Sequence, residues 1–205
     1  PALADNIPGS ASTEVPELTE KASELMIRSI KENMRPLRDP GGSPDVSVST
    51  SGTLMGVGAD VGTGETSLGL RFDYRDLDTS RLDGSILSGN VLLGKTIDES
   101  TLVFGGLLVE QLDTDTLMNE GTVENSGVGL ALGMDYRLND GFYMTGILGY
   151  MDLDYDVTRS GGAVTGSFGA QRTFVDLSAD YLTETGNADI LLGFGLLYVN
   201  QNNDS

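Results

Sequence analysis

The chain has 205 residues, 28 of them glycine, with no cysteine, histidine or tryptophan and a net charge of −19. The absence of cysteine and histidine excludes disulfides, Cys/His zinc sites, haem ligation by histidine, and catalytic triads or dyads that use histidine. The negative charge disfavours nucleic acid or an anionic lipid surface as a partner, because like charges repel unless a local basic patch reverses the sign. We therefore expect no catalytic residue, no bound metal and no cofactor.

The first 45 residues differ in character from the rest. Residues 1–16 are punctuated by Pro, Ser, Ala and Gly, which predicts a disordered or extended lead-in. Apolar residues then recur at three- and four-residue spacing, which predicts an amphipathic helix over 17–39, followed by a linker over 40–45 that contains two prolines. The apolar face of this helix comprises Leu18, Ala22, Leu25, Met26, Ile30, Met34 and Leu37.

Residues 46–205 have the pattern of an all-β domain. Apolar runs separated by Gly, Asn, Asp, Ser and Thr cover 46–61, 66–77, 85–94, 101–112, 127–138, 142–156, 167–182 and 189–200. Several runs alternate strictly, so that one face is apolar and the other is charged or small. The predicted fold is an antiparallel up-and-down β-barrel of at least eight strands, preceded by one amphipathic α-helix.

The connectors between these runs alternate in length. Those at 62–65, 95–100, 139–141 and 183–188 are short, whereas those at 78–84, 113–126 and 157–166 are longer. This alternation is typical of outer-membrane barrels, which have tight turns at one rim and long loops at the other. Such barrels begin at the rim with the short turns, so we expect either a further short strand within 44–52, turning at Ser51 and Gly52, or a partial barrel.

Tyrosine and glycine placement add to this pattern. The seven tyrosines lie toward strand ends or beside turns, which predicts two interfacial girdles at the edges of a bilayer. They are Tyr74, Tyr136, Tyr143, Tyr150, Tyr155, Tyr181 and Tyr198. Glycine recurs at alternate strand positions (127, 129, 133, 193 and 195), which predicts close approach of another element, such as a helix inside the barrel.

The segment Gly-Met-Asp-Tyr-Arg-Leu-Asn-Asp-Gly-Phe-Tyr-Met-Thr-Gly-Ile-Leu-Gly-Tyr-Met-Asp-Leu-Asp-Tyr-Asp over 133–156 resembles the translocator β-domain of bacterial autotransporters. The resemblance extends over about residues 46–200. It implies a twelve-stranded outer-membrane barrel whose pore holds a helix that links an exported passenger to the first strand. It also implies outer-membrane lipid, a passenger N-terminal to the helix and the barrel-assembly machinery as partners.

On this interpretation the helix and the barrel lumen are electrostatically complementary. The basic helix residues are Lys21, Arg28, Lys31, Arg35 and Arg38. The charges expected to face the lumen are Arg71, Asp73, Arg75, Asp135, Arg137, Asp176 and Asp180. The apolar stripe of the helix leaves open a second arrangement, in which the helix packs on the outside of the sheet.

The sequence is also compatible with two other functions. One is a soluble secreted acidic β-barrel or sandwich that acts as a binding or structural module. The other is a small eight-stranded outer-membrane barrel with an adhesin or stability role. The acidic groups at 152, 154 and 156 and at 113, 115 and 120 lack the spacing of a calcium loop and are interpreted as solvated.

Overall fold

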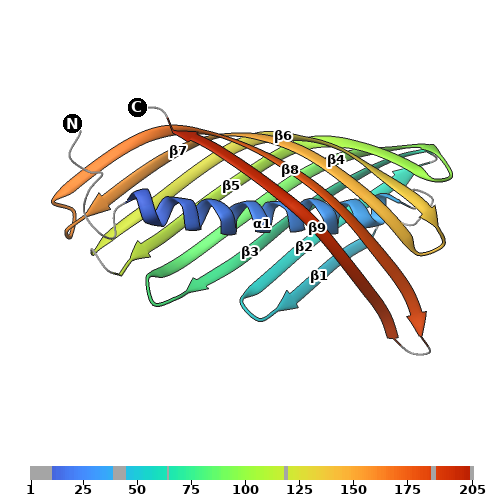
Figure 1. Cartoon of the computed structure of the whole chain (residues 1–205), viewed down its shortest axis with the longest axis horizontal. Helices are drawn as coiled ribbons and strands as arrows, with labels where there is room; N and C mark the ends of the chain where they lie inside the picture. Colours follow the sequence, from blue (N-terminus) through green and yellow to red (C-terminus); the bar gives the residue numbers. More distant parts are fainter. Residues whose placement is uncertain (1–10, 39–44, 64, 118–119, 186–187, 204–205) are drawn as a thin grey trace.

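The computed structural model of the chain describes residues 11–38, 45–63, 65–117, 120–185 and 188–203. These residues form one helix followed by nine strands (Figure 1). The elements are α1 (Ala11–Leu37), β1 (Asp45–Ser51), β2 (Leu54–Thr63), β3 (Thr66–Asp78), β4 (Leu82–Asp98), β5 (Thr101–Thr116), β6 (Gly121–Asn139), β7 (Phe142–Arg159), β8 (Val164–Thr185) and β9 (Ala188–Asn203).

The helix is longer than predicted. It begins at Ala11, so the prediction that residues 11–16 form an extended lead-in is wrong. The fixed φ of proline is compatible with a helix, so Pro16 removes one backbone hydrogen-bond donor but does not end the helix. The helix ends at Leu37, directly after Pro36. The predicted lead-in over 1–10 and most of the predicted linker, residues 40–44, lie outside the described residues.

The nine strands form one antiparallel sheet in sequence order, which confirms the predicted all-β, up-and-down fold. The predicted run over 46–61 divides into β1 and β2, with Gly52 at a φ of 59° in the turn between them. This confirms the expected extra strand and makes the count nine rather than the eight of the small-barrel alternative. In the described part of the chain no hydrogen-bonded ladder joins β1 to β9, so the sheet is curved but is not closed by hydrogen bonds.

The connections divide between two rims. Two-residue connections at 64–65, 99–100, 140–141 and 186–187 define the short-turn rim, where β1 begins. Connections of two to four residues, at 52–53, 79–81, 117–120 and 160–163, define the long-turn rim, where β9 ends. The predicted long loops over 113–126 and 157–166 are wrong, because strands β5 to β8 continue through their polar residues and Asp113 pairs with Glu124. Backbone ladders need no apolar side chains.

The sheet curves around α1, which lies on its inner face (Figure 1). The helix contacts β2, β3, β4, β5 and β9. Its predicted apolar stripe, from Leu18 to Leu37, is fully buried against inward-facing side chains such as Ile86, Leu92 and Leu108. Burying each of these side chains contributes roughly 1.5–3 kcal/mol. The alternative that places the helix outside the sheet is therefore wrong.

Glycines allow the helix to approach the sheet at two positions. A side chain at Gly69 would collide with Asn33 of the helix, and one at Gly94 would lie against Leu37. The glycines that the sequence analysis singled out act differently. Side chains added at Gly127, Gly129, Gly133, Gly193 and Gly195 would meet residues of neighbouring strands, so the prediction that a helix approaches there is wrong.

We expect Gly69→Ala to destabilise the fold by about 1–3 kcal/mol, the usual cost of overpacking. The added methyl group would displace Asn33, which is buried and hydrogen-bonded to Asn90 at 2.6 Å. Gly166→Ala is the matched control, because nothing lies within 4 Å of its added methyl group. Urea unfolding of the two variants measures the difference, and equal midpoints would contradict this account of the helix contact.

Candidate functional site: an apolar outer face and a polar interior

The sheet has its apolar side chains on the outside and its charged side chains on the inside. In β3 the side chains of Leu68, Leu70 and Phe72 point outward and are about two-fifths exposed. Between them Arg71 and Asp73 point inward and are only 3% and 4% exposed. This arrangement is the reverse of a soluble sheet, whose apolar face is the buried one.

The exposed apolar side chains form a continuous band around the outer face, which we call the apolar band. On β6 and β7 it runs from the short-turn rim for about nine residues, the length that a tilted strand needs to cross a bilayer. The members of the band include Met55, Val57, Leu68, Leu70, Phe72, Val91, Leu93, Leu107, Val109, Val128, Leu130, Leu132, Met134, Met144, Leu148, Leu177, Leu192, Phe194 and Leu196.

Five of the seven tyrosines lie at the edges of this band. Tyr74, Tyr150 and Tyr198 are its last outward residues toward the long-turn rim, each followed two residues later by an Asp or Asn. Tyr136 and Tyr181 are outward and close to the short-turn rim. An exposed tyrosine ring between an apolar and a polar zone is the arrangement predicted from the sequence.

The other two tyrosines face inward, so the predicted interfacial position is wrong for both. Tyr155 is 1% exposed and stacks on Phe168, with ring centroids 4.9 Å apart. Tyr143 lies on the inner face, where the guanidinium carbon of Arg38 is 4.0 Å from its ring centroid. Alternation along β7 places both on the opposite face from Tyr150.

Beyond the apolar band, toward the long-turn rim, the outer face is acidic. Glu124 pairs in register with Asp113 on one side and with Asp156 on the other, and all three side chains are exposed. In the described part of the chain no group of three acidic residues is arranged to hold a metal ion. These three carboxylates are exposed to solvent.

At the short-turn rim, Asp98 receives hydrogen bonds from the backbone N–H of Ser100 and the hydroxyl of Thr101, at 2.8 and 3.1 Å. These hydrogen bonds favour the ionised carboxylate and lower the pKa of Asp98. The charge of Asp98 therefore helps to hold the tight turn between β4 and β5.

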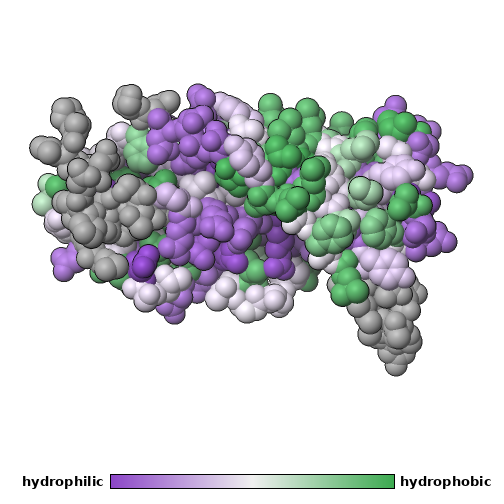
Figure 2. All heavy atoms as spheres, viewed as in Figure 1, coloured by the Kyte–Doolittle hydropathy of each residue, from purple (hydrophilic) through white to green (hydrophobic). Residues whose placement is uncertain are grey.

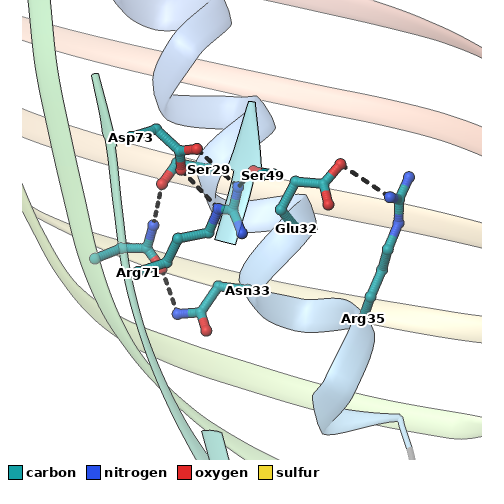
Figure 3. A network of polar contacts seen from close by, with 8 residues as sticks. Ser29, Glu32, Asn33, Arg35, Ser49, Arg71 and Asp73 are labelled. Atoms are coloured by element: carbon teal, nitrogen blue, oxygen red, sulfur yellow. Dashed lines mark hydrogen bonds and ion pairs between the residues drawn. The ribbon is translucent and has the colours of Figure 1, made fainter. Parts of the chain in front are cut away.

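The interior beside β1 to β4 contains a polar cluster (Figure 3). Arg71 donates two hydrogen bonds to Asp73, at 2.7 and 2.8 Å, and a third to Ser49 on β1 at 2.9 Å. Nearby, Asn33 of the helix donates to Asn90 of β4. Asn90 in turn donates to Ser29 of the helix at 2.7 Å, so paired amides fix the rotation of α1 against the sheet.

A second interior cluster is centred on Arg172, which is 1% exposed. Its guanidinium donates to Glu110 at 2.8 Å, to Gln201 at 3.0 Å and to the Tyr155 hydroxyl at 3.0 Å. Asn125 donates to the other oxygen of Glu110 at 3.0 Å. The cluster therefore joins every strand from β5 to β9.

The same cluster reaches the helix, because the Thr19 hydroxyl donates to Gln201 at 3.1 Å. This contact places the N-terminal half of α1 near the long-turn rim, where β9 ends. A groove of about 550 Å³ lies between this part of α1 and β9. It is lined by Val15, Pro16, Thr19, Glu20, Glu24, Leu197, Val199, Gln201 and Asn203.

Two of the five basic helix residues pair with predicted acidic partners on the sheet. Lys31 lies 2.7 Å from Asp176, and Arg38 donates to both oxygens of Asp135 at 2.7 and 2.9 Å. Thr145 also donates to Asp135, at 2.6 Å. These pairs hold the C-terminal half of α1 and Arg38 against β6 and β8, at the opposite rim from Thr19.

The remaining predicted charges lie elsewhere. Lys21 and Arg35 pair within the helix, with Glu17 and Glu32, and Arg28 is half-exposed. Of the predicted lumen charges, Asp73 pairs with Arg71 and not with the helix, whereas Arg75 lies 3.5 Å from Glu24 of the helix. Arg137 donates a hydrogen bond to the Glu99 carbonyl, and Asp180 is half-buried on the inner face. All seven predicted lumen charges occupy inner-face positions.

Glu110 and Arg172 form the most buried ion pair of the described residues, and neither was predicted as a site residue. A signal was present, since Glu110 lies between Leu108 and Leu112 with the same parity, so one charge interrupts an inward apolar series. A buried carboxylate in that position requires a cation, but the sequence does not say which one.

The hydrophilic side of the helix is turned toward the opening between β1 and β9. Glu20 and Glu24 are exposed there, whereas the opposite side of α1 is buried in the sheet. Figure 2 shows hydrophilic atoms over the middle of this face, where α1 is visible in Figure 1. In the described part of the chain, no helix is long and apolar enough to span a membrane.

Comparison of the chain with protein-family models, with curated proteins and with solved structures gives no match.

Proposed function

We propose that this chain is a non-catalytic outer-membrane β-domain that anchors or exports a passenger, as an autotransporter translocator does. The observation that carries the proposal is the reversed polarity of the sheet, with an apolar band outside and ion pairs inside. The band, bounded by tyrosines, matches the height and edges of a bilayer-facing surface. The domain belongs in the outer membrane, and its partners are lipid on the outer face and a passenger joined to the helix.

The soluble alternative fits this surface poorly. Soluble monomers rarely expose contiguous apolar patches larger than about 300–600 Å². Here Leu93, Leu132, Leu148 and Leu177 are each more than half exposed on the outer face. Leu132 and Leu148 are partners in register, only Gly105 separates Leu93 from Leu132, and Leu177 lies two residues from the register partner of Leu148. A bilayer removes the cost of this exposure, whereas water does not.

The path of α1 supports a translocator or anchor over other membrane barrels. Thr19 lies near the long-turn rim, Arg38 lies at the short-turn rim, and β1 begins at the short-turn rim. A passenger that precedes α1 is therefore presented at the long-turn rim. In outer-membrane barrels the longer loops are extracellular, so that rim faces outward. The role of the barrel-assembly machinery follows from the family resemblance alone.

Tryptophan fluorescence tests the membrane assignment, because the chain has no tryptophan of its own. We expect Leu148→Trp to be quenched by phosphatidylcholine with brominated acyl chains, and Asp156→Trp to be quenched little. Both positions lie on the outer face of β7, one inside the band and one beyond it. Equal quenching at both, or a chain that is monodisperse in buffer without detergent, would exclude the proposal.

Surface labelling of intact Gram-negative cells tests the export direction. An epitope placed before Ala11 is expected to be accessible to antibody from outside. The same epitope inserted between Glu99 and Ser100, in a short turn, is expected to be inaccessible until the outer membrane is permeabilised. Labelling of the second epitope on intact cells would reverse the proposed orientation.

A further inference from the structure

Among the described strand residues, the outer face of the sheet carries one cation, Lys95. The arginines of the strands all occupy inner-face positions, whereas Lys95 of β4 points outward and is exposed. Within the described part of the chain, Lys95 forms no ion pair with a carboxylate within 4.0 Å. Because Lys95 lies between the exposed side chains of Leu93 and Ile97, its charge lies just inside the edge of the apolar band.

A groove leads from Lys95 into the apolar band. Its volume is about 440 Å³, and its lining includes Leu93, Val103, Gly105 and Leu132, with Thr66 and Lys95 at one end. The groove exists because Gly105 has no side chain between Leu93 on β4 and Leu132 on β6, its partners in register. A side chain at Gly105 would collide with Leu132, whose methyl group lies 2.7 Å from the position of the added Cβ, so a larger residue would displace Leu132 and change the groove.

We propose that this groove is a binding site for an anionic phospholipid, with one acyl chain over Gly105 and the headgroup phosphate at Lys95 and Thr66. The inference rests on the proposed membrane location. An apolar channel that ends at an ammonium group and a hydroxyl is complementary to a lipid that joins a hydrocarbon chain to a phosphate. A lysine near a membrane edge extends its charge to the headgroup region, so we expect the ammonium of Lys95 to extend toward the short-turn rim.

The commitment to an anionic lipid follows from the charge. A zwitterionic headgroup supplies a cation as well as a phosphate, whereas phosphatidylglycerol supplies a net negative charge. One lysine near an anionic lipid surface contributes about 1 kcal/mol, which corresponds to about fivefold in affinity. The nearby carboxylates at Glu65 and Asp98 lie in or beside turns and form no ion pair with Lys95, which leaves the ammonium available.

A single-tryptophan reporter measures the preference directly. Ile97→Trp lies two residues from Lys95, at an exposed position in the irregular end of β4, and Leu192→Trp is an exposed reporter on β9. Each is reconstituted in phosphatidylcholine vesicles that contain increasing brominated phosphatidylglycerol. We expect about fivefold preference for phosphatidylglycerol at Ile97→Trp and none at Leu192→Trp.

Variants assign the effect to the groove. In the Ile97→Trp background, Lys95→Gln is expected to abolish the preference, Lys95→Arg to keep it, and Gly105→Leu to weaken it by filling the channel. A preference that survives Lys95→Gln, or that is equal at both reporters, would overturn the proposed site. If no brominated lipid quenches either reporter, the membrane location itself is wrong, so the two failures are distinct.

Discussion

Replacing Arg172 with methionine is expected to lower the free energy of unfolding by about 3–5 kcal/mol, the cost of leaving a buried charge without its partner. The carboxylate of Glu110 has no exposure and lies 2.8 Å from the Arg172 guanidinium. Tyr155 and Gln201 would each lose a hydrogen-bond donor in the same variant. Urea unfolding of the chain in detergent, followed by the shift of the folded band on a semi-native gel, measures the loss.

The control for this prediction is the same substitution at a solvated pair. Arg75→Met removes an arginine whose partner, Glu24, is half exposed, so we expect a loss of at most about 1 kcal/mol. The double variant Arg172→Met/Glu110→Met is expected to regain part of the loss, because it removes both buried charges. Strict additivity of the two single substitutions would show that the pair is not coupled.

The fold was predictable because its signal is local. Alternation of apolar and polar residues over a few positions sets the faces of each strand, and Gly or Asn sets the turns. The ends of the hairpins were not predictable in the same way. Asp113 and Glu124 were assigned to a loop because they are charged, although their backbones continue the ladder beyond the apolar band.

The interior was predictable only in part. The pairing of Lys31 and Arg38 with aspartates on the sheet followed from opposite charges on two elements expected to face each other. The pairing of Arg172 with Glu110 depends on the register of several strands and on the curvature of the sheet, because 62 residues separate the two. No local pattern contains that information.

Two tyrosines were wrongly predicted to be interfacial, although the sequence contains the information that places them on the inner face. Tyr150 and Tyr155 are five positions apart, and Tyr143 and Tyr150 are seven apart, all in β7. Residues an odd number of positions apart in a strand face opposite sides. The three therefore could not all be interfacial, and Tyr155 instead serves the interior cluster through its hydroxyl.

The sheet has two open edge strands, β1 and β9, and its interior is filled with side chains. The interior beside α1 is occupied by apolar side chains and ion pairs, which hold the helix against the sheet. Both edge strands run in the same direction, because β1 and β9 each start at the short-turn rim. Direct pairing of β1 with β9 would thus be parallel and would break the antiparallel order of the sheet.

Replacing Leu132 with arginine is expected to destabilise the chain in phosphatidylcholine vesicles by about 2–4 kcal/mol, the cost of arginine on the lipid-facing surface near the bilayer midplane. Leu132 is 65% exposed and lies midway between Val128 and Tyr136 on the outer face of β6. In water the same substitution at an exposed position would change stability by only about 0.5 kcal/mol. The size of the loss in stability therefore shows whether the outer face contacts lipid or water.

Glu124→Arg is the matched control, because residue 124 lies on the same face of the same strand but beyond the apolar band. An arginine near or outside the interface costs only about 0–1 kcal/mol, and here it also separates two facing carboxylates, Asp113 and Asp156. The fraction of heat-modifiable, folded chain is measured against urea concentration in vesicles for both variants. Since α1 and the interior ion pairs are unchanged in either variant, a large loss at Leu132 with none at Glu124 would locate the bilayer at the apolar band. Equal small losses would instead assign the outer face to water and exclude the membrane location.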